Sequence, residues 1–220
     1  MNPLLLPLVL PGVYAPQEDT ALLAGALAEE PLRPGADVLD VGTGSGALAI
    51  EAARRGTRVT AVDVSWRAVC TARANAWVAG VPVRIRRGNL FAPVRDRSFD
   101  LILTNPPYVP APMGIRPRGP ARAWDAGRDG RFVVDRICRE ASPLLRPGGV
   151  LLMVHSALSD PDRTLVHLRT AGLKASVTRR SRIAFGPVVR GRADWLRQRG
   201  LLSPADEKEE LVVVRAELPV

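Results

Sequence analysis

The feature that most constrains the fold of this chain is a regular alternation of short apolar runs with longer amphipathic segments between Ala36 and Val154. Short apolar runs predict strands, and apolar positions that recur every three to four residues predict helices. The expected strands span 36–41, 58–64, 83–87, 99–104 and 149–155, and the expected helices span 46–55, 66–78 and 131–145. Strands joined through helices run parallel and are covered on both faces. The alternation therefore predicts a doubly wound α/β fold.

The segments outside this core complete the predicted domain. Residues 163–170 are expected to form a helix, and residues 174–178 and 211–216 two closing strands, which makes a mostly parallel sheet of seven strands. An arginine-rich stretch, 179–199, is expected to join the two closing strands. A chain of 220 residues with 46% hydrophobic content can bury one core. We therefore expect a single domain, with an N-terminal arm and helix in 1–30, the core in 36–156 and the closing elements in 157–220.

The first 13 residues are apolar, but they include three prolines and lack a basic flank. They are also too few for a membrane helix, which needs about 20 apolar residues. We interpret this stretch as an arm packed on the domain, and we expect a cytoplasmic protein without membrane contact.

The net charge of +9 at pH 7 would suit a nucleic-acid partner, because clustered cations release counterions from phosphates. The excess is nearly all arginine, since the only lysines are Lys174 and Lys208. Coding bias produces the same skew, so a nucleic-acid partner stays open but is not favoured. Cys70 and Cys138 lie in apolar helical patterns without metal-ligand spacing. We therefore expect two buried thiols, no disulfide and no metal site.

A glycine-rich loop follows the first predicted strand. Gly42, Thr43 and Gly44 open this loop, which leads directly into a helix. Glycine permits a tight turn and a close approach of ligand to backbone, while amide groups at the start of the helix offer donors. Asp40 precedes the loop, where its carboxylate could pair with the ammonium group of an amino-acid moiety. The pattern also fits the dinucleotide fingerprint GxGxxA, so an NAD-binding interpretation stays open at this point.

Polar residues also follow the next two predicted strands. Asp63 and Val64 end the second strand, where the carboxylate could accept hydrogen bonds from both hydroxyls of a ribose. Asn89 and Leu90 follow the third strand and could give an adenine ring one polar and one apolar contact. The alternative is that Asp40 and Asp63 only cap the following helices. Suitable residues at three successive strand ends favour nucleoside binding.

Asn105, Pro106, Pro107 and Tyr108 end the fourth strand, which is expected beside the first. Consecutive prolines fix the backbone and donate no hydrogen bonds, so the Asn105 side chain and the proline carbonyls form a rigid wall of acceptors. Such a wall can grip a substrate NH2 group, orient its nitrogen toward an electrophilic methyl group and favour the pyramidal transition state. Tyr108 could stack on the planar group. The alternative is a turn that merely ends the strand, but the position beside a nucleotide-type loop favours catalysis.

These residues resemble the motifs of the class I methyltransferases, which have a Rossmann-like fold and use S-adenosylmethionine (SAM). Two flanking segments make the chain similar, within that class, to the HemK/PrmC-type glutamine N5-methyltransferases of polypeptide release factors. Residues 13–20, VYAPQEDT, resemble the segment that closes over the cofactor in the short members of that family. Residues 123–131, AWDAGRDGR, resemble the segment that follows its catalytic loop. The resemblance covers roughly residues 13–156.

The resemblance implies roles for the matching positions. Asn105, Pro106 and Tyr108 would be catalytic because they would grip the target amide and line its pocket, and Pro107 and Trp124 would contact the substrate. SAM would be contacted by the three strand ends and by one residue of the N-terminal segment, namely Thr20, Asp40, Gly42, Thr43, Gly44, Asp63, Val64, Asn89 and Leu90.

Two positions depart from the family pattern. Asn89 stands where an aspartate is common, and Ala126 where a second glycine is common, but neither change removes an acceptor from the catalytic wall. The short members that this chain resembles lack the N-terminal helical domain of the longer ones and work with a partner subunit. The resemblance therefore implies a protein substrate, such as a release factor, and a small activating subunit as a possible partner.

Other functions stay open from the sequence alone. The same acceptor wall serves the exocyclic amine of adenine in DNA or RNA, although no domain for flipping and reading a base is evident. A lysine or small-molecule amine must first lose a proton, and no general base is evident near Asn105; His155 is expected to be a packing or surface residue. A non-catalytic SAM-binding subunit would not need Asn105 with a whole cofactor set. An NAD oxidoreductase would need a separate substrate domain.

Overall fold

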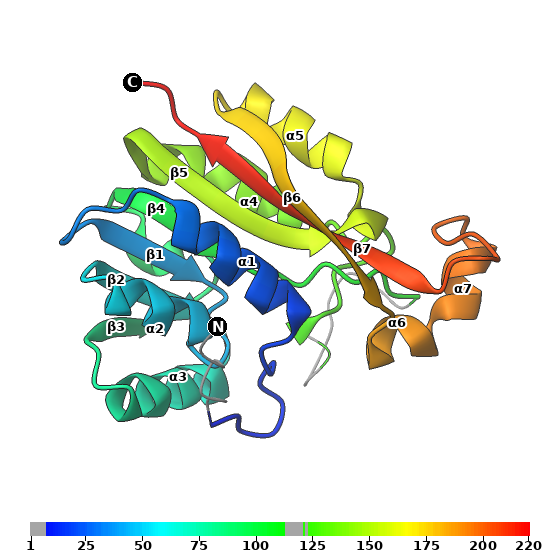
Figure 1. Ribbon diagram of the computed structural model, residues 1–220, viewed down its shortest axis with the longest axis horizontal. Helices are drawn as coiled ribbons and strands as arrows, with labels where there is room; N and C mark the ends of the chain where they lie inside the picture. Colours follow the sequence, from blue (N-terminus) through cyan, green and yellow to red (C-terminus); the bar gives the residue numbers. More distant parts are fainter. Residues whose placement is uncertain (1–7, 113–120, 122) are drawn as a thin grey trace.

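The structure is a computed structural model that describes residues 8–112, 121 and 123–220. Its strands form one sheet in the order β3-β2-β1-β4-β5-β7-β6 (Figure 1). Every neighbouring pair from β3 to β5 is parallel, whereas β7 runs antiparallel to both β5 and β6. The strands are β1 (Asp37–Val41), β2 (Arg58–Asp63), β3 (Val83–Arg87), β4 (Phe99–Thr104), β5 (Leu145–Ser156), β6 (Lys174–Ala184) and β7 (Lys208–Glu217).

Helices alternate with the strands as the sequence predicts. They are α1 (Glu18–Glu29), α2 (Ala47–Arg54), α3 (Trp66–Val78), α4 (Val134–Glu140), α5 (Pro161–Thr170), α6 (Pro187–Gly191) and α7 (Ala193–Gln198). The seven-stranded, mostly parallel α/β fold is therefore confirmed, and α3, β3 and β4 have the predicted bounds.

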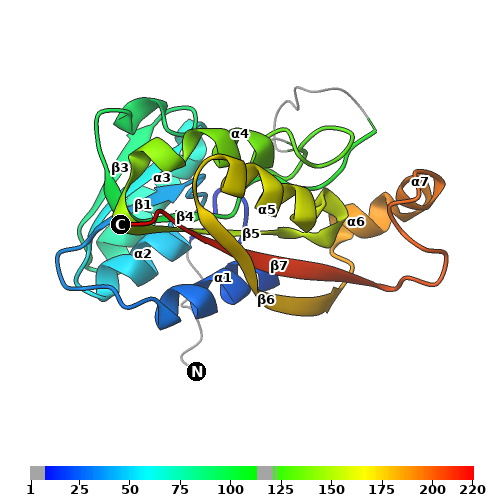
Figure 2. The ribbon, with the colours of Figure 1, turned by 90° about the horizontal axis from the view of Figure 1, so that it is seen from above.

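The sheet separates two hydrophobic cores because successive strand residues point to opposite faces. Val38 of β1 packs in one core with residues of α1, α2 and α3, while its neighbour Leu39 packs in the other with residues of α4 and α5. The same division holds in β7, where Val213 belongs to the first core and Val212 to the second. Figure 2 shows these helices on the two sides of the sheet. Both faces are thus covered, which explains the continuous apolar runs of the central strands.

Three predictions about local structure are wrong. The helix expected over 131–145 is confined to α4 and a 3₁₀ turn at Ser142–Leu144, because Pro143 disfavours a continuing helix in the residue before it. The arginine-rich stretch is not a simple connection: β6 continues to Ala184, and α6 and α7 follow. Cys138 is buried as expected, but Cys70 is exposed on the outer side of α3.

The topology places the loops that follow β1, β2, β3 and β4 at one edge of the sheet, since parallel strands have their carboxyl ends together. Antiparallel β7 begins at that same edge, where Leu211 pairs with Ser156 at the end of β5. In the part of the chain that the structure describes, no helix has the length and apolar character needed to cross a membrane.

Candidate active site

A cavity of about 1110 Å³ lies at this edge of the sheet. Its wall includes the glycine-rich loop, the ends of β2, β3 and β4, residues 12–20 of the N-terminal arm and the first turn of α1, and Glu209 at the start of β7. Every site residue predicted from the sequence lies in this wall except Asp40. The volume is in the range of sites that bury a ligand of drug size or larger.

The glycine-rich loop surrounds Asp40 instead of exposing it to the cavity. The Asp40 side chain is fully buried, and its Oδ2 accepts a hydrogen bond of 2.5 Å from the Thr43 hydroxyl. Burial raises the pKa of Asp40 to about 7, although the Thr43 hydrogen bond acts in the opposite direction. The Thr43 contact fixes the loop, and the contact between Asp40 and an ammonium group stays a prediction. Gly46, whose φ is +86°, lets the loop enter α2 close to Ala72 of α3.

Asp63 faces the cavity at the end of β2 and also holds the loop. Its Oδ2 accepts from the Gly44 amide at 3.0 Å, and its Oδ1 accepts from the Ser65 amide at 2.8 Å. The N-cap of α3 is Ser65, whose side chain accepts from the Ala68 amide, so Asp63 is not the N-cap of that helix. A carboxylate oxygen can accept more than one hydrogen bond, so these contacts are compatible with ligand hydroxyls.

Asn89 and Leu90 lie in the cavity wall after β3, as expected. Leu90 has a φ of +48°, a left-handed conformation that costs a non-glycine residue about 1–2 kcal/mol. The side-chain oxygen of Asn89 accepts from Arg136 of α4 at 3.3 Å, and Arg136 also lines the cavity. The sequence pattern gave no reason to select Arg136, because it lies in an amphipathic helix far along the chain.

Asn105 is held from the N-terminal side of the cavity. Its Nδ2 donates to the Thr20 hydroxyl at 3.4 Å, and that hydroxyl donates to Oδ1 of Asp19 at 3.2 Å. The Thr20 amide also donates to Asp19 Oδ1, at 2.6 Å. Because the NH2 group of Asn105 is used in this way, the oxygen of the planar carboxamide is directed to the opposite side, where it can act as an acceptor.

Asp19 connects Asn105 to the tyrosine of the same loop. Its Oδ2 accepts from the Tyr108 hydroxyl at 3.0 Å and from the Tyr14 hydroxyl at 2.7 Å. Burial, followed by the negative charge of Asp19, raises the pKa of both tyrosines well above the ordinary value, so both hydroxyls stay protonated and donate. Asp19 was not selected from the sequence. It lies one residue before Thr20 in the segment that carries the family resemblance, which was the available signal.

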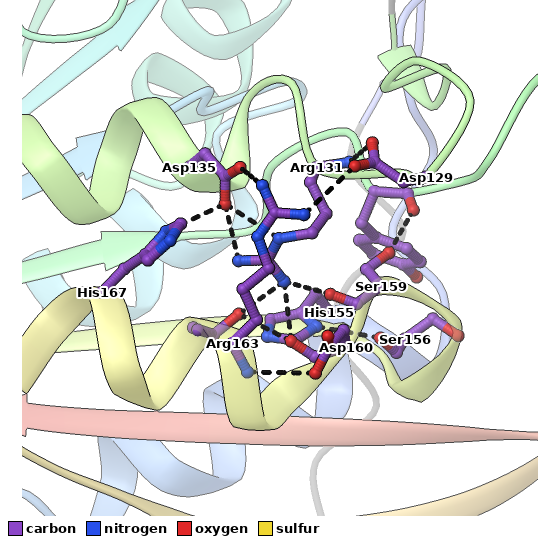
Figure 3. Close-up of polar contacts among 11 residues, drawn as sticks. Asp129, Arg131, Asp135, His155, Ser156, Ser159, Asp160, Arg163 and His167 are labelled. Carbon is purple, nitrogen blue, oxygen red and sulfur yellow. Dashed lines mark hydrogen bonds and ion pairs between the residues drawn. The ribbon is translucent and has the colours of Figure 1, made fainter.

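A buried arginine fixes the main chain of the Asn105–Tyr108 loop from the other side. Arg131 is 1% exposed, and Figure 3 shows it beside Asp135, Ser159 and Asp160. Its Nη1 donates to the carbonyl oxygens of Ser159 and Asp160, the latter at 2.7 Å. The Ser159 hydroxyl in turn donates to the Tyr108 carbonyl at 2.6 Å. The donors of a buried guanidinium must be satisfied, so this cluster has a defined geometry.

Asp135 balances the charge of that arginine. It accepts from Arg131 Nε at 2.8 Å and forms a second ion pair of 2.8 Å with Arg163 of α5. Gly130 has a φ of +71°, and a Cβ atom there would lie 2.3 Å from the Tyr108 carbonyl. The segment after the catalytic loop therefore requires glycine at this position, which explains why the GR pair at 130–131 is part of the recognisable sequence.

Trp124 and Pro107 also lie in the cavity wall, and their contact with substrate stays a prediction. The Trp124 carbonyl accepts from the Val109 amide at 2.8 Å, and the neighbouring Asp125 forms an ion pair of 2.6 Å with Arg192 between α6 and α7. These contacts join the loop after β4 to the two short helices that sequence reasoning missed.

Two titratable residues lie near the end of β5. His155 is fully buried and is not in the cavity wall; its Nδ1 lies 2.9 Å from the Ser156 carbonyl, and burial lowers its pKa to about 4. The expectation of a packing residue is confirmed. Glu209 of β7 does line the cavity and is 4% exposed, and burial raises its pKa to about 7. Sequence reasoning missed Glu209 because it is one of five consecutive charged residues, 206–210, a pattern that is typical of a solvated turn.

Comparisons with known proteins agree with this geometry. The model of the methyltransferase small domain matches residues 8–113. A protein of Methanocaldococcus jannaschii with the provisional name protein N5-glutamine methyltransferase is 33% identical over 177 residues, which cover 80% of this chain and 88% of that protein. The release factor glutamine methyltransferase of Gloeobacter violaceus is 41% identical over 144 residues, or 61% of this chain, and the match spans half of its length.

A solved structure with a similar fold is the E. cuniculi Mtq2-Trm112 complex, which is responsible for the methylation of the termination factor eRF1. The TM-score is 0.64 at 24% identity, with 94% of this chain and 99% of that chain covered. A sheet of this order, with a nucleotide-type loop after β1 and an acceptor loop after β4, defines a class I methyltransferase. Within that class, the chain belongs to the protein N5-glutamine methyltransferase family.

Proposed function

We propose that this chain binds SAM in the cavity and transfers its methyl group to the side-chain amide nitrogen of a glutamine in a protein. The observation that carries this proposal is the position of Asn105. Its carboxamide is oriented by the Thr20 hydroxyl at 3.4 Å, immediately beyond the strand that lies next to the glycine-rich loop. An acceptor held in a fixed direction beside a nucleoside site is what transfer to an NH2 group requires.

The residues in the cavity wall fit SAM as the cofactor. Asp63 presents a carboxylate to ribose hydroxyls, Leu90 presents an apolar side chain to an adenine ring, and the Gly44 region allows close approach of ligand to backbone. SAM would supply a methyl group activated by a positively charged sulfur. The nearby carboxylates of Asp19 and Glu209 would favour that positive charge, and the buried position of the site strengthens such interactions.

The acceptor loop suits a neutral amide. The Asn105 oxygen and the carbonyl of buried Pro106 would accept the two hydrogens of the substrate NH2 group, which withdraws the nitrogen lone pair from conjugation with its carbonyl. Tyr108 would bound the pocket, because its hydroxyl is anchored on Asp19 and its carbonyl is anchored on Ser159. Pro107 and Trp124 would contact the substrate chain at the mouth of the cavity.

We further infer that the protein substrate is a peptide chain release factor, on the strength of the relatives that carry this function in their names. The second subunit in the Mtq2-Trm112 complex supports the proposal that a small activating subunit also works with this chain. Adenine in DNA or RNA is the alternative acceptor, and the test below includes it.

The test is methyl transfer from labelled SAM to the purified release factor of the same organism, to that factor with each candidate glutamine changed to glutamate, and to adenine-containing DNA and RNA. We expect label on the protein, at a glutamine identified by tandem mass spectrometry. Asn105→Ala should abolish transfer while SAM affinity stays within a few-fold, because Asn105 acts on the acceptor. Label on nucleic acid but not on protein would contradict the glutamine assignment, and full activity of Asn105→Ala would contradict its role.

A further inference from the structure

Glu209 is a carboxyl group in the cavity wall to which the proposed function assigns no specific step. It is 4% exposed, although both of its sequence neighbours, Lys208 and Glu210, point away from the core. Glu210 forms an ion pair of 2.6 Å with Arg180 of β6 on the outer surface. Burying a carboxyl group without a cation partner is costly, so its position at a binding site indicates a use.

The sheet order places Glu209 at the acceptor end of the cavity. The three strands β4, β5 and β7 are neighbours; Asn105 follows β4, Ser156 ends β5, and Glu209 begins antiparallel β7. All three positions are therefore at one edge of the sheet. Two strand spacings, roughly 10 Å, separate the two positions across the sheet, and Glu209 also lies four residues of β7, roughly 13 Å, beyond the level of Asn105. Both side chains line the same cavity, and Asp19, which holds Asn105 through Thr20, also acts electrostatically on Glu209.

The groups that surround Glu209 set its chemistry. The Ser156 hydroxyl donates a hydrogen bond to it from β5, and Asp19 at the start of α1 repels its charge. The negative charge of Glu209 acts on the Tyr14 and Tyr108 hydroxyls. The residue opposite Glu209 on β6 is the uncharged Ile183. Burial and the charge of Asp19 favour the protonated carboxylic acid, and the Ser156 hydrogen bond acts in the opposite direction.

Asp19 is already used to hold the acceptor loop. Its two oxygens already accept four hydrogen bonds, from the two tyrosine hydroxyls and from the amide and hydroxyl of Thr20. A proton that arrived at Asp19 would displace one of these donors and release Asn105 or Tyr108. Protonation of Glu209 would instead relieve the repulsion from Asp19 and leave the acceptor loop in place.

We propose that Glu209 accepts the proton that the substrate nitrogen loses when it is methylated. This inference rests on the proposed transfer to an amide. The nitrogen lone pair forms the bond to the methyl carbon, the bond from that carbon to sulfur breaks, and its electron pair stays on sulfur. The nitrogen then carries one proton too many, and that N–H bond breaks as the Glu209 carboxylate becomes a carboxylic acid. The sulfonium charge and the carboxylate charge are both neutralised, so the total charge is unchanged.

The reaction should depend on pH in a defined direction. Only ionised Glu209 can accept a proton, and burial raises its pKa to about 7. The value of kcat should therefore rise with pH through about 7 and level off above it. A proton acceptor whose affinity for protons lies near the working pH contributes most to the rate.

The experiment compares Glu209→Gln with the matched control Glu210→Gln, which removes a neighbouring surface charge from the same strand. Steady-state kinetics with the release factor as acceptor should show kcat lowered by roughly 100-fold or more in Glu209→Gln, within the range for loss of a general base. The KM for the acceptor should change only a few-fold, and the rise of kcat through pH 7 should disappear. Glu210→Gln should keep both the wild-type rate and the pH profile.

Two further measurements exclude a merely structural effect. Adding formate, a small carboxylate, should restore part of the rate to Glu209→Ala. Infrared spectra of the protein without ligands should show carboxylic acid absorption that titrates near pH 7, and Glu209→Gln should lose the part that comes from Glu209 while the part from Asp40 stays. A wild-type kcat and pH profile in Glu209→Gln would overturn the inference alone. A wild-type protein that methylates no glutamine would overturn the proposed function, and the inference with it.

Discussion

Asp19 is the residue whose replacement tests the acceptor loop most sharply. Asp19→Asn preserves size but replaces one acceptor oxygen with an NH2 group. If that group takes the position of Oδ1, it faces the Thr20 amide, which lies at 2.6 Å and cannot reverse its role as donor. If it takes the position of Oδ2, the Tyr14 and Tyr108 hydroxyls must rotate to become acceptors. In both orientations the connection from Asn105 through Thr20 is weakened.

The size of the effect follows from the number of bonds affected. A hydrogen bond to a charged group contributes about 1.5–3 kcal/mol. Asp19→Asn leaves four hydrogen bonds without a charged acceptor, and at least one of them loses its acceptor atom altogether. Loss of one such bond in the transition state corresponds to a decrease of roughly 10- to 150-fold in kcat. The affinity for SAM should change less, because Asp19 acts on the acceptor loop.

The assay is kcat and KM for the release factor, with SAM affinity measured by calorimetry on the same samples. Asp194→Asn is the matched control, since that side chain is 94% exposed in a surface ion pair and is not part of the cavity wall. Thermal unfolding shows whether Asp19→Asn remains folded at the assay temperature. If the folded variant keeps kcat within twofold of wild type, Asp19 does not position Asn105 and Tyr108, and the reasoning fails.

Four other measurements test separate parts of the structure. Asp63→Ala should weaken SAM binding by about 1–3 kcal/mol; an unchanged dissociation constant would remove Asp63 from the cofactor site. Arg131→Met should lower the free energy of unfolding by about 3 kcal/mol. This is the low end for a broken buried ion pair, because Arg163 still faces Asp135. A Tm within 2 °C of wild type, roughly the shift expected for 1 kcal/mol, would refute this prediction. Folding raises the pKa of Glu209 to about 7, so its ionisation destabilises the folded protein as pH rises. The Tm of Glu209→Gln should therefore be higher than that of wild type at pH 8 and equal to it at about pH 5. A difference in Tm that does not vary with pH would argue against a buried charge. Cys70 should react with a thiol reagent in the native protein, whereas Cys138, whose pKa burial raises to about 12, should react only after unfolding; equal rates would contradict the packing of α4.

The sequence was sufficient where local pattern and tertiary burial agree. The strands β1, β2 and β4 are buried on both faces, so each reads as an apolar run, and the loops after them carry glycine, aspartate or proline in positions that turn chemistry explains. The loop from Asn105 to Tyr108 was placed correctly for the same reason. Strand β6 was too short in the prediction because it is an edge strand, with Arg180 and Arg182 exposed at alternate positions and little apolar signal.

The rest of the site depends on contacts between distant segments, which periodicity does not report. Asp19 meets Tyr108 across 89 positions of sequence, and Glu209 arrives in the cavity from the last strand. Asp40 is also oriented by packing: its place at a strand end predicts a contact with ligand, and its Oδ2 is held inside the loop by the Thr43 hydroxyl. Residue type and spacing locate such a site, whereas the direction of each side chain is decided by packing.

The position of β7 determines when the sheet can be completed during synthesis of the chain. The strand is the last in the sequence, yet it lies inside the sheet between β5 and β6, where Val212, Val213 and Val214 are fully buried in the two cores. A ribosome delivers residues 208–217 after all other strands, so until then β5 and β6 have no partner between them and the cavity lacks the wall that Glu209 forms. Such non-local pairing is slow and exposes strand edges in the meantime. A nascent chain of this protein therefore has neither a closed sheet nor a complete cavity until residues 208–217 have been added.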